Sequence, residues 1–317
     1  MNGRIEKEEL AKEKMEMKLN DMPEIFTIFY NWLDARDRSY TTIRNYISHV
    51  DEFMTFFTKG KKNQEFYINV TDNDIEKFMV SLKNKKVGDE IRAAKWSSLN
   101  TFFKFLSQKK YIATNPMLLT ERPKIRTEHA VTYLTPEEIS SIFTRIHQES
   151  TKMNKNRDVC IIALGISTGL RVSAIVNINV ENIDFSTNTI KVTEKGRKVR
   201  YISFADNLRN LLLIWLKDRE IYFNGQTTGP LFLSQQKKRL SVDSVGLMIE
   251  KYTNHLDKHI TPHKLRSSAA MNLYGAGTDI LTIASLLGHE NVTTTQRYVK
   301  AYEESKKEAT NILDSLI

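Results

Sequence analysis

Apolar residues recur at steps of three and four through the first third of the chain, and this spacing favours α-helix over strand. The period runs through four stretches, at residues 25–33, 43–57, 75–82 and 96–106. Hydroxyl and carboxylate side chains at 39–42 and 71–74 are typical of helix starts. The pattern stops at Asn115-Pro116. The sequence therefore predicts a small all-helical bundle over residues 22–118.

The segment after this bundle, residues 119–133, is polar and basic and is interpreted as a linker. Its charges have two interpretations: a solvated surface, or a segment that follows the phosphates of a nucleic acid. Residues 1–21 form a charged, helix-prone lead-in without the apolar core of a secretory signal. The sequence thus divides into a lead-in, a first domain, a linker and a second domain.

The second domain, residues 134–317, is predicted to be mostly helical with a small β element. Thr135-Pro136 is typical of a helix start. Further helices are predicted over 158–167, 208–222, 243–256, 264–274, 280–287 and 293–305. Two short β-rich runs flank Glu194-Lys195-Gly196-Arg197 and predict a hairpin whose turn contains Gly196. The fold class is therefore mainly α: a helical bundle followed by a mostly helical domain with a small sheet or hairpin.

Composition excludes several classes of protein. The only cysteine, Cys160, lies in an apolar run and is predicted to be a buried, inert thiol. With one cysteine and no clustered histidines, the sequence does not favour a structural zinc site. No stretch approaches the roughly 20 apolar residues of a membrane helix. The net charge of +9 modestly favours a polyanionic partner. We expect a cytoplasmic protein without a membrane partner.

Two arginines of the second domain are candidates for binding a phosphate. Arg171 follows Gly169-Leu170, where an apolar helix is predicted to stop, and Arg266 lies three residues after His263. Guanidinium groups bind two phosphate oxygens each and stay charged at working pH. The alternative is that each arginine pairs with a surface carboxylate.

A lysine and two histidines are candidates for proton transfer. Lys195, in the turn of the hairpin, is suited to protonate a departing oxygen. Its alternative is a solvated lysine among other basic residues. His263 and His289 can accept a proton or donate a hydrogen bond to phosphate, although a single histidine is more often structural.

Tyr298 is the candidate nucleophile. It lies in a predicted helix that opens at 293–295, shortly after Gly288-His289. A tyrosine hydroxyl has a reference pKa near ~10 and needs help to attack phosphorus at neutral pH. Tyr302, one turn further along the same helix, is the competing candidate.

Taken together, these segments resemble the signature of tyrosine site-specific recombinases, the family of phage integrases and Xer-type resolvases. The resemblance rests on Thr168-Gly169-Leu170-Arg171, residues 194–200, His263-Lys264-Leu265-Arg266, and Leu287-Gly288-His289 followed by Tyr298. It covers the whole second domain. Residues 39–46 also resemble the helix entry of the family's DNA core-binding domain, which the first domain would then be.

The resemblance implies a role for each candidate. Arg171 and Arg266 would clamp the phosphate, Lys195 would be the general acid, and Tyr298 would form a 3′-phosphotyrosine. His263 would be the acid/base partner and His289 a further phosphate donor. No metal and no other cofactor is implied.

The chain departs from the family pattern at two positions. Relatives often have a glutamate three residues after Arg171, where this chain has Ala174. Many have a second histidine where this chain has Ser267. Neither change removes a reacting group, so we expect an active enzyme, and these two positions are where its rate could differ from that of relatives.

The resemblance also implies partners: double-stranded DNA at specific sites, a homodimer on each site, a tetramer in the synapse, and accessory proteins in some systems. An apolar stripe in the tail, at Ala309, Ile312, Leu313 and Leu316, fits packing on its own domain or docking on a neighbouring subunit.

Three other functions stay open at this point. A type IB topoisomerase would use similar chemistry without pairing sites. A DNA-binding or architectural protein would have lost catalysis, although all six reacting residues are present here. A metal-dependent nuclease would need clustered carboxylates, and the sequence has no such cluster.

Overall fold

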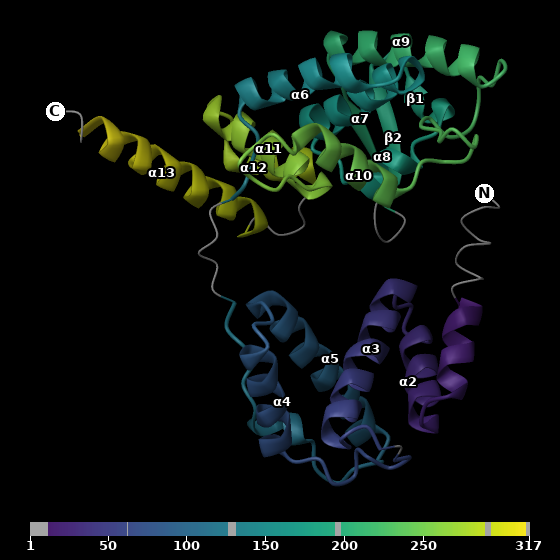
Figure 1. The fold of residues 1–317 in the computed structure, drawn as a ribbon, viewed down its shortest axis with the longest axis vertical. Coiled ribbons are helices and arrows are strands. Elements are labelled where there is room, and N and C mark those ends of the chain that lie inside the picture. The colour runs from purple at the N-terminus through teal and green to yellow at the C-terminus, as the bar shows by residue number, and fades with distance from the viewer. Residues whose placement is uncertain (1–11, 62, 126–130, 194–197, 289–292, 315–317) are drawn as a thin grey trace. The chain divides into compact units, whose positions relative to one another are not determined.

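The computed structural model describes residues 12–61, 63–125, 131–193, 198–288 and 293–314 (Figure 1). The chain forms two compact units, residues 1–129 and residues 130–317. Both are mainly helical, and the second unit also contains a three-stranded sheet. The predicted fold class is therefore confirmed.

The first unit is an all-helical bundle. A helix over residues 12–20 precedes α2 (Glu24–Asp34), α3 (Tyr40–Phe57), α4 (Asp72–Asn84), α5 (Asp89–Gln108) and the 3₁₀ turn η1 (Pro116–Leu119). Phenylalanine dominates its core, with Phe29 and Phe102 packed edge to face at 5.1 Å between ring centroids. Met15 and Leu19 of the charged lead-in are buried in the same core. The bundle therefore uses apolar residues from the lead-in as well as from the four periodic stretches.

The starts of two of these helices follow the predicted capping residues. The Ser39 side chain accepts a hydrogen bond from the Thr42 backbone at the start of α3. Thr71 and Asp74 form a reciprocal capping box at the start of α4. These caps satisfy backbone N–H groups that have no partner inside the helix. The sequence cues for these helix starts are confirmed.

The second unit contains most of the motif residues. Its elements are α6 (Pro136–Glu149), α7 (Lys152–Thr168), α8 (Val172–Asn177), the 3₁₀ turn η2 (Val180–Asn182), β1 (Ile183–Asp184), β2 (Thr189–Thr193), β3 (Val199–Ser203), α9 (Asp206–Tyr222), α10 (Val242–Thr253), α11 (Pro262–Gly275), α12 (Ile280–Leu287) and α13 (Thr293–Asp314). The buried helix α7 lies at the centre, in contact with α6, α8, α9 and α11.

Cys160 on α7 is fully buried, and its thiol contacts the Leu211 carbonyl at 3.0 Å. Burial raises the pKa of this thiol, as expected for an inert cysteine.

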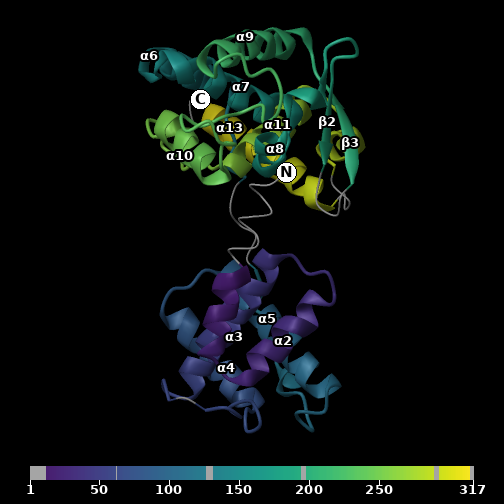
Figure 2. The ribbon, with the colours of Figure 1, turned by 90° about the vertical axis from the view of Figure 1, so that its right-hand side faces the viewer.

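The predicted hairpin is present as β2 and β3, which appear as neighbouring arrows in Figure 2. The strands are antiparallel, with Val192 opposite Arg200 and Thr193 opposite Val199 at the end nearest the turn. The short strand β1 adds to β2 only at its other end, beside Thr189 and Ile190. The end of the hairpin near its turn is therefore a two-stranded ribbon.

Helix α13 begins against α11 and α12, and its later turns extend away from both helices in Figure 1. The tail positions Ala309, Ile312 and Leu313 belong to this helix, but their side chains lie outside the described residues, as does Leu316. The two interpretations of the apolar stripe therefore stay predictions.

Across the part of the chain that the structure describes, no helix has the length and apolar character needed to cross a membrane.

Candidate active site

Arg171 lies at a tight turn between two helices, as its glycine-containing neighbourhood predicts. Helix α7 ends at Thr168, Gly169 follows in the left-handed conformation with φ of 62°, and Arg171 is the residue immediately before α8. The Arg171 side chain is exposed. A phosphate arriving from solvent can therefore reach this guanidinium.

Gly169 also permits close contact between two of the motif segments. A β-carbon built at this position would lie 2.2 Å from Cδ2 of Leu287, at the end of α12. The left-handed backbone and the contact both require glycine, because any other side chain would be strained and would displace Leu287. The turn that carries Arg171 is thus seated directly on the end of α12.

We predict that Gly169→Ala lowers the free energy of unfolding by about 2–4 kcal/mol, combining the cost of a left-handed alanine with overpacking. Urea-induced unfolding of the full chain measures this loss. Gly225→Ala is the matched control, because Gly225 has φ of 76° but no atom within 4 Å of an added β-carbon. The control should lose only about 1–2 kcal/mol. Equal losses in the two variants would show that the Leu287 contact is not what requires glycine.

His263 and Arg266 lie in the first turns of α11, but in different environments. His263 is exposed, whereas Arg266 has 2% of its surface exposed. Pro262 opens the helix at a position where its missing N–H costs nothing. The burial of Arg266 rules out the alternative of a surface ion pair for this residue.

The Arg266 guanidinium joins two distant backbone segments. Its Nη1 donates to the carbonyl of Gly169 at 2.8 Å, and its Nη2 donates to the carbonyl of Leu287 at 2.7 Å. Both carbonyls lie at helix C-termini, where the aligned peptide dipoles favour a cation. Arg266 therefore holds the Arg171 turn, its own helix and the end of α12 together.

Helix α12 is fixed at both ends. At its start, the Asp279 carboxylate accepts hydrogen bonds from the Leu281 and Thr282 backbone at 3.0 Å each. Hydrogen bonds, first of all from Thr282, lower the pKa of this carboxyl. At its end, Gly288 closes the helix in the left-handed conformation with φ of 68°. The caps at Asp279 and Gly288 therefore fix the position of the backbone just before His289.

Arg200 of β3 is a second cation at this helix end, and the sequence had offered it only as one of several basic residues around Lys195. Its Nη2 donates to the carbonyls of Ser285 and Leu286 at 3.0 and 2.9 Å. The last three carbonyls of α12 are thus bonded to Arg200 and Arg266. No sequence signal identifies this contact, because the partners are 85 and 86 residues away.

Tyr298 lies in the second turn of α13 and is 3% exposed. It belongs to a small apolar cluster formed with Ala270, Met271, Ile283, Leu287 and Ala301. Two members come from α11 and two from α12, so the same helices that carry Arg266 and lead to His289 also surround Tyr298. The candidate nucleophile is thus brought to the motif segments by packing.

Tyr302 packs differently from Tyr298. Its ring stands edge-on to Tyr274 at 5.2 Å between centroids, and it lies against Gly275 at the end of α11. The structure therefore gives Tyr302 a packing role at the opposite end of α11 from His263.

Two of the six predicted residues, Lys195 and His289, lie outside the described residues. Their neighbours in the chain are described: Thr193 and Val199 end the two strands of the hairpin, and Gly288 ends α12.

The two positions that depart from the family pattern are buried. Ala174 offers only a methyl group beside the Arg171 turn, and the Ser267 hydroxyl points back to the His263 carbonyl at 3.4 Å.

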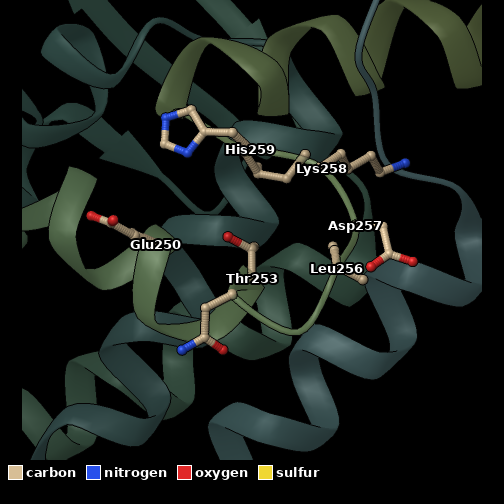
Figure 3. Close-up of a pocket in the computed structure, with 8 residues that line it drawn as sticks. Glu250, Thr253, Leu256, Asp257, Lys258 and His259 are labelled. Carbon is tan, nitrogen blue, oxygen red and sulfur yellow. The ribbon is translucent and has the colours of Figure 1, made fainter.

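A hollow of about 340 Å³ lies elsewhere, at the loop between α10 and α11 (Figure 3). Lys258 and His259 point in opposite directions from this loop, and Lys258 bonds to Glu138 at 2.6 Å. None of the four described site residues lines the hollow. The candidate site is therefore on the surface around Arg171 and His263, which suits a large ligand rather than an enclosed small molecule.

Comparison with known proteins gives matches over both units. A family model described as the phage integrase family matches residues 132–305, and the phage integrase N-terminal SAM-like domain matches residues 27–110. The tyrosine recombinase XerC of Syntrophus aciditrophicus (strain SB) is 32% identical over 294 residues, covering 87% of this chain and 93% of the relative.

Two solved structures share the fold. The XerH site-specific recombinase bound to a palindromic difH substrate matches with a TM-score of 0.70 and 20% identity, over 88% of this chain and 82% of that one. A lambda integrase (75–356) dimer bound to a COC′ core site matches with a TM-score of 0.69 and 19% identity, over 87% and 94%. The two-part helical architecture is thus common to all three proteins.

Proposed function

The chain belongs to the phage integrase family of tyrosine recombinases, and from this membership we propose that it cuts and rejoins DNA at specific sites through a 3′-phosphotyrosine. The observation that carries the proposal is the double contact of Arg266. It joins the turn of Arg171, the helix of His263 and the end of α12 next to His289. Residues far apart in the sequence are thereby held together: the exposed Arg171 and His263 can meet a DNA phosphate, while Arg266, with 2% of its surface exposed, contributes its charge from the interior.

We propose for each residue the role that the family resemblance implies and that its chemistry can perform. Arg171 and Arg266 neutralise the scissile phosphate and the extra charge of the pentacovalent transition state. Tyr298 attacks phosphorus while Lys195 gives a proton to the departing 5′ oxygen. His263 exchanges the tyrosine proton, and His289 donates a further hydrogen bond to phosphate. No step in this scheme uses a metal ion or another cofactor.

The burial of Tyr298 places a requirement on this reaction. A nucleophile must touch the phosphorus that it attacks, and Tyr298 has only 3% of its surface exposed. The proposal therefore requires that the first turns of α13 shift when DNA binds.

We propose that the partner is double-stranded DNA, contacted by both units, with the first as the core-binding domain over residues 22–118. The net charge of +9 supports contacts to phosphates. Two copies would bind each site, which the lambda integrase dimer on a core site supports, and four would form the synapse. Such an enzyme works where the chromosome or plasmid is, which implies a cytoplasmic protein. Accessory proteins would take part in some recombination reactions of this kind.

A plasmid assay tests this function. A site recovered by binding selection from genomic fragments is placed twice in one plasmid and incubated with the full chain in EDTA. We expect recombinant products in EDTA at a rate within about twofold of that with Mg²⁺, because arginine and lysine rather than a metal stabilise the transition state. Loss of products in EDTA would contradict the metal-free mechanism.

The same assay separates the alternatives. A type IB topoisomerase would relax a plasmid without the selected site, whereas the recombinase should leave it supercoiled. A DNA-binding protein without catalysis would shift the site in a gel but produce neither relaxation nor recombination. The presence of all six candidate residues favours the recombinase.

A further inference from the structure

The end of the β2–β3 hairpin nearest its turn has little support from the third strand of the sheet. Strand β1 pairs only with Thr189 and Ile190, so the ribbon beyond them has two strands. A two-stranded hairpin alone is at best marginally stable in water. This end is therefore held by packing outside the sheet: Val192 of β2, which lies opposite Arg200, is 3% exposed and belongs to the apolar core of the second unit.

Arg200 provides a contact that holds the turn end of the hairpin from β3. Along β3 the exposed residues Val199 and Tyr201 alternate with the more buried Arg200 and Ile202, so Arg200 is the residue nearest the turn on the inner face. It reaches across to α12 and bonds to the carbonyls of Ser285 and Leu286. The favourable interaction of a cation with a helix C-terminus strengthens this contact.

The two sides of the contact differ in how firmly they are held. Helix α12 has the Asp279 cap at its start, Gly288 and Arg266 at its end, and Leu287 in an apolar cluster. Among the described residues, the hairpin end is held by its ladder, by Val192 in the apolar core and by Arg200 on β3. Removing the Arg200 side chain should therefore loosen the β3 side of the hairpin end more than it affects α12.

We propose that Arg200 is a positioning residue for the general acid: its bond to α12 holds the hairpin so that Lys195 meets the departing 5′ oxygen. The inference rests on the proposed function. In the cleavage step, the Tyr298 hydroxyl gives its proton to His263 and its oxygen forms a bond to phosphorus. The bond between phosphorus and O5′ breaks, and the Lys195 ammonium transfers its proton to O5′. A lysine on a loose hairpin would be near that oxygen only part of the time.

The test compares two DNA substrates that differ in the leaving atom. One has the natural 5′ oxygen, and the other has sulfur at this bridging position. A thiol ionises near pH ~8.5, so a thiolate departs without being protonated. We expect Arg200→Ala to slow cleavage of the oxygen substrate at least about tenfold and to leave cleavage of the sulfur substrate within about twofold of wild type. Lys195→Ala should show the same pattern with a larger loss.

Further variants separate positioning from other roles. Arg200→Lys keeps the charge and should restore part of the rate. Tyr201→Ala is the matched control, since Tyr201 is the adjacent residue on the outer face and is 68% exposed; it should cleave both substrates normally. DNA affinity of Arg200→Ala should stay within about twofold, because a lost phosphate contact would weaken binding instead. Thermal unfolding checks that Arg200→Ala and Arg200→Lys are folded.

The outcomes distinguish the inference from the proposed function. If wild type cleaves neither substrate, the recombinase proposal fails. If wild type and Lys195→Ala behave as expected but Arg200→Ala cleaves both substrates at the wild-type rate, only the role of Arg200 fails. Equal loss on both substrates, or weaker DNA binding, would also overturn the positioning role.

Discussion

Tyr298→Phe is expected to eliminate covalent attachment of the protein to DNA, with a fall in cleavage rate of at least about 10⁴. The phenyl ring keeps the contacts to Ala270, Met271 and the other members of the cluster, so only the hydroxyl is lost. The cost to stability should be about 1 kcal/mol or less. The measurement is single-turnover cleavage of nicked substrates in EDTA, with adducts separated after denaturation.

Tyr302→Phe is the matched control for this variant. It removes a hydroxyl from the same helix, one turn away, and preserves the ring contact with Tyr274. Cleavage by Tyr302→Phe should stay within about threefold of wild type, since no bond to phosphorus is affected. Adducts formed by Tyr298→Phe but absent from Tyr302→Phe would move the nucleophile to Tyr302.

Arg266→Met is expected to have the second largest effect, because this side chain has both a structural and a chemical role. Methionine fills the buried site but leaves the carbonyls of Gly169 and Leu287 without their donors. Losing two charge-assisted hydrogen bonds should lower the free energy of unfolding by about 3–5 kcal/mol. Cleavage by the folded fraction should fall by about 10³, through loss of charge at the transition state.

Arg219→Met separates these two effects. Arg219 is 1% exposed and donates to the carbonyls of Thr228 and Pro230, at 2.7 and 2.9 Å, rather than to any motif segment. Its loss should destabilise the second unit to a similar degree. Cleavage per folded molecule, measured well below the unfolding temperature, should nevertheless stay near wild type. Equal losses of cleavage in the two variants would mean that Arg266 acts only through stability.

Much of the fold follows from local patterns in the sequence. The four periodic stretches of the first unit became helices, and the caps at Ser39 and Thr71 are where helix-start signals predicted them. The hairpin followed from two β-rich runs around Gly196. These features depend on neighbours within a few residues, which is why one sequence is enough to predict them.

Other elements had no such signal. Helix α8 has six residues and β1 has two, too few for a period to appear. Helix α7 begins at Lys152, ahead of the expected start at residue 158, because its first turns are polar and hide the apolar pattern. Met15 and Leu19 stand among charged residues and gave no sign of joining a core.

The chemistry of the candidate site is still a prediction from the sequence, and its contacts could not be predicted. The order of Arg171, Lys195, His263, Arg266 and Tyr298 follows from the motifs. The bonds of Arg266 span 97 and 21 residues, and those of Arg200 span about 85, so they depend on how whole helices pack. Local patterns carry no information on such distant pairings.

Mapping the residue that becomes attached to DNA tests the central proposal most directly. Adducts trapped in EDTA on nicked substrates are digested with nuclease and trypsin and analysed by mass spectrometry. Trypsin cuts after Arg297 and Lys300, so Tyr298 and Tyr302 fall on different peptides. We expect the nucleotide remnant on the peptide of residues 298–300. A remnant on residues 301–306, or on any other peptide, would contradict the assignment of Tyr298 as the nucleophile.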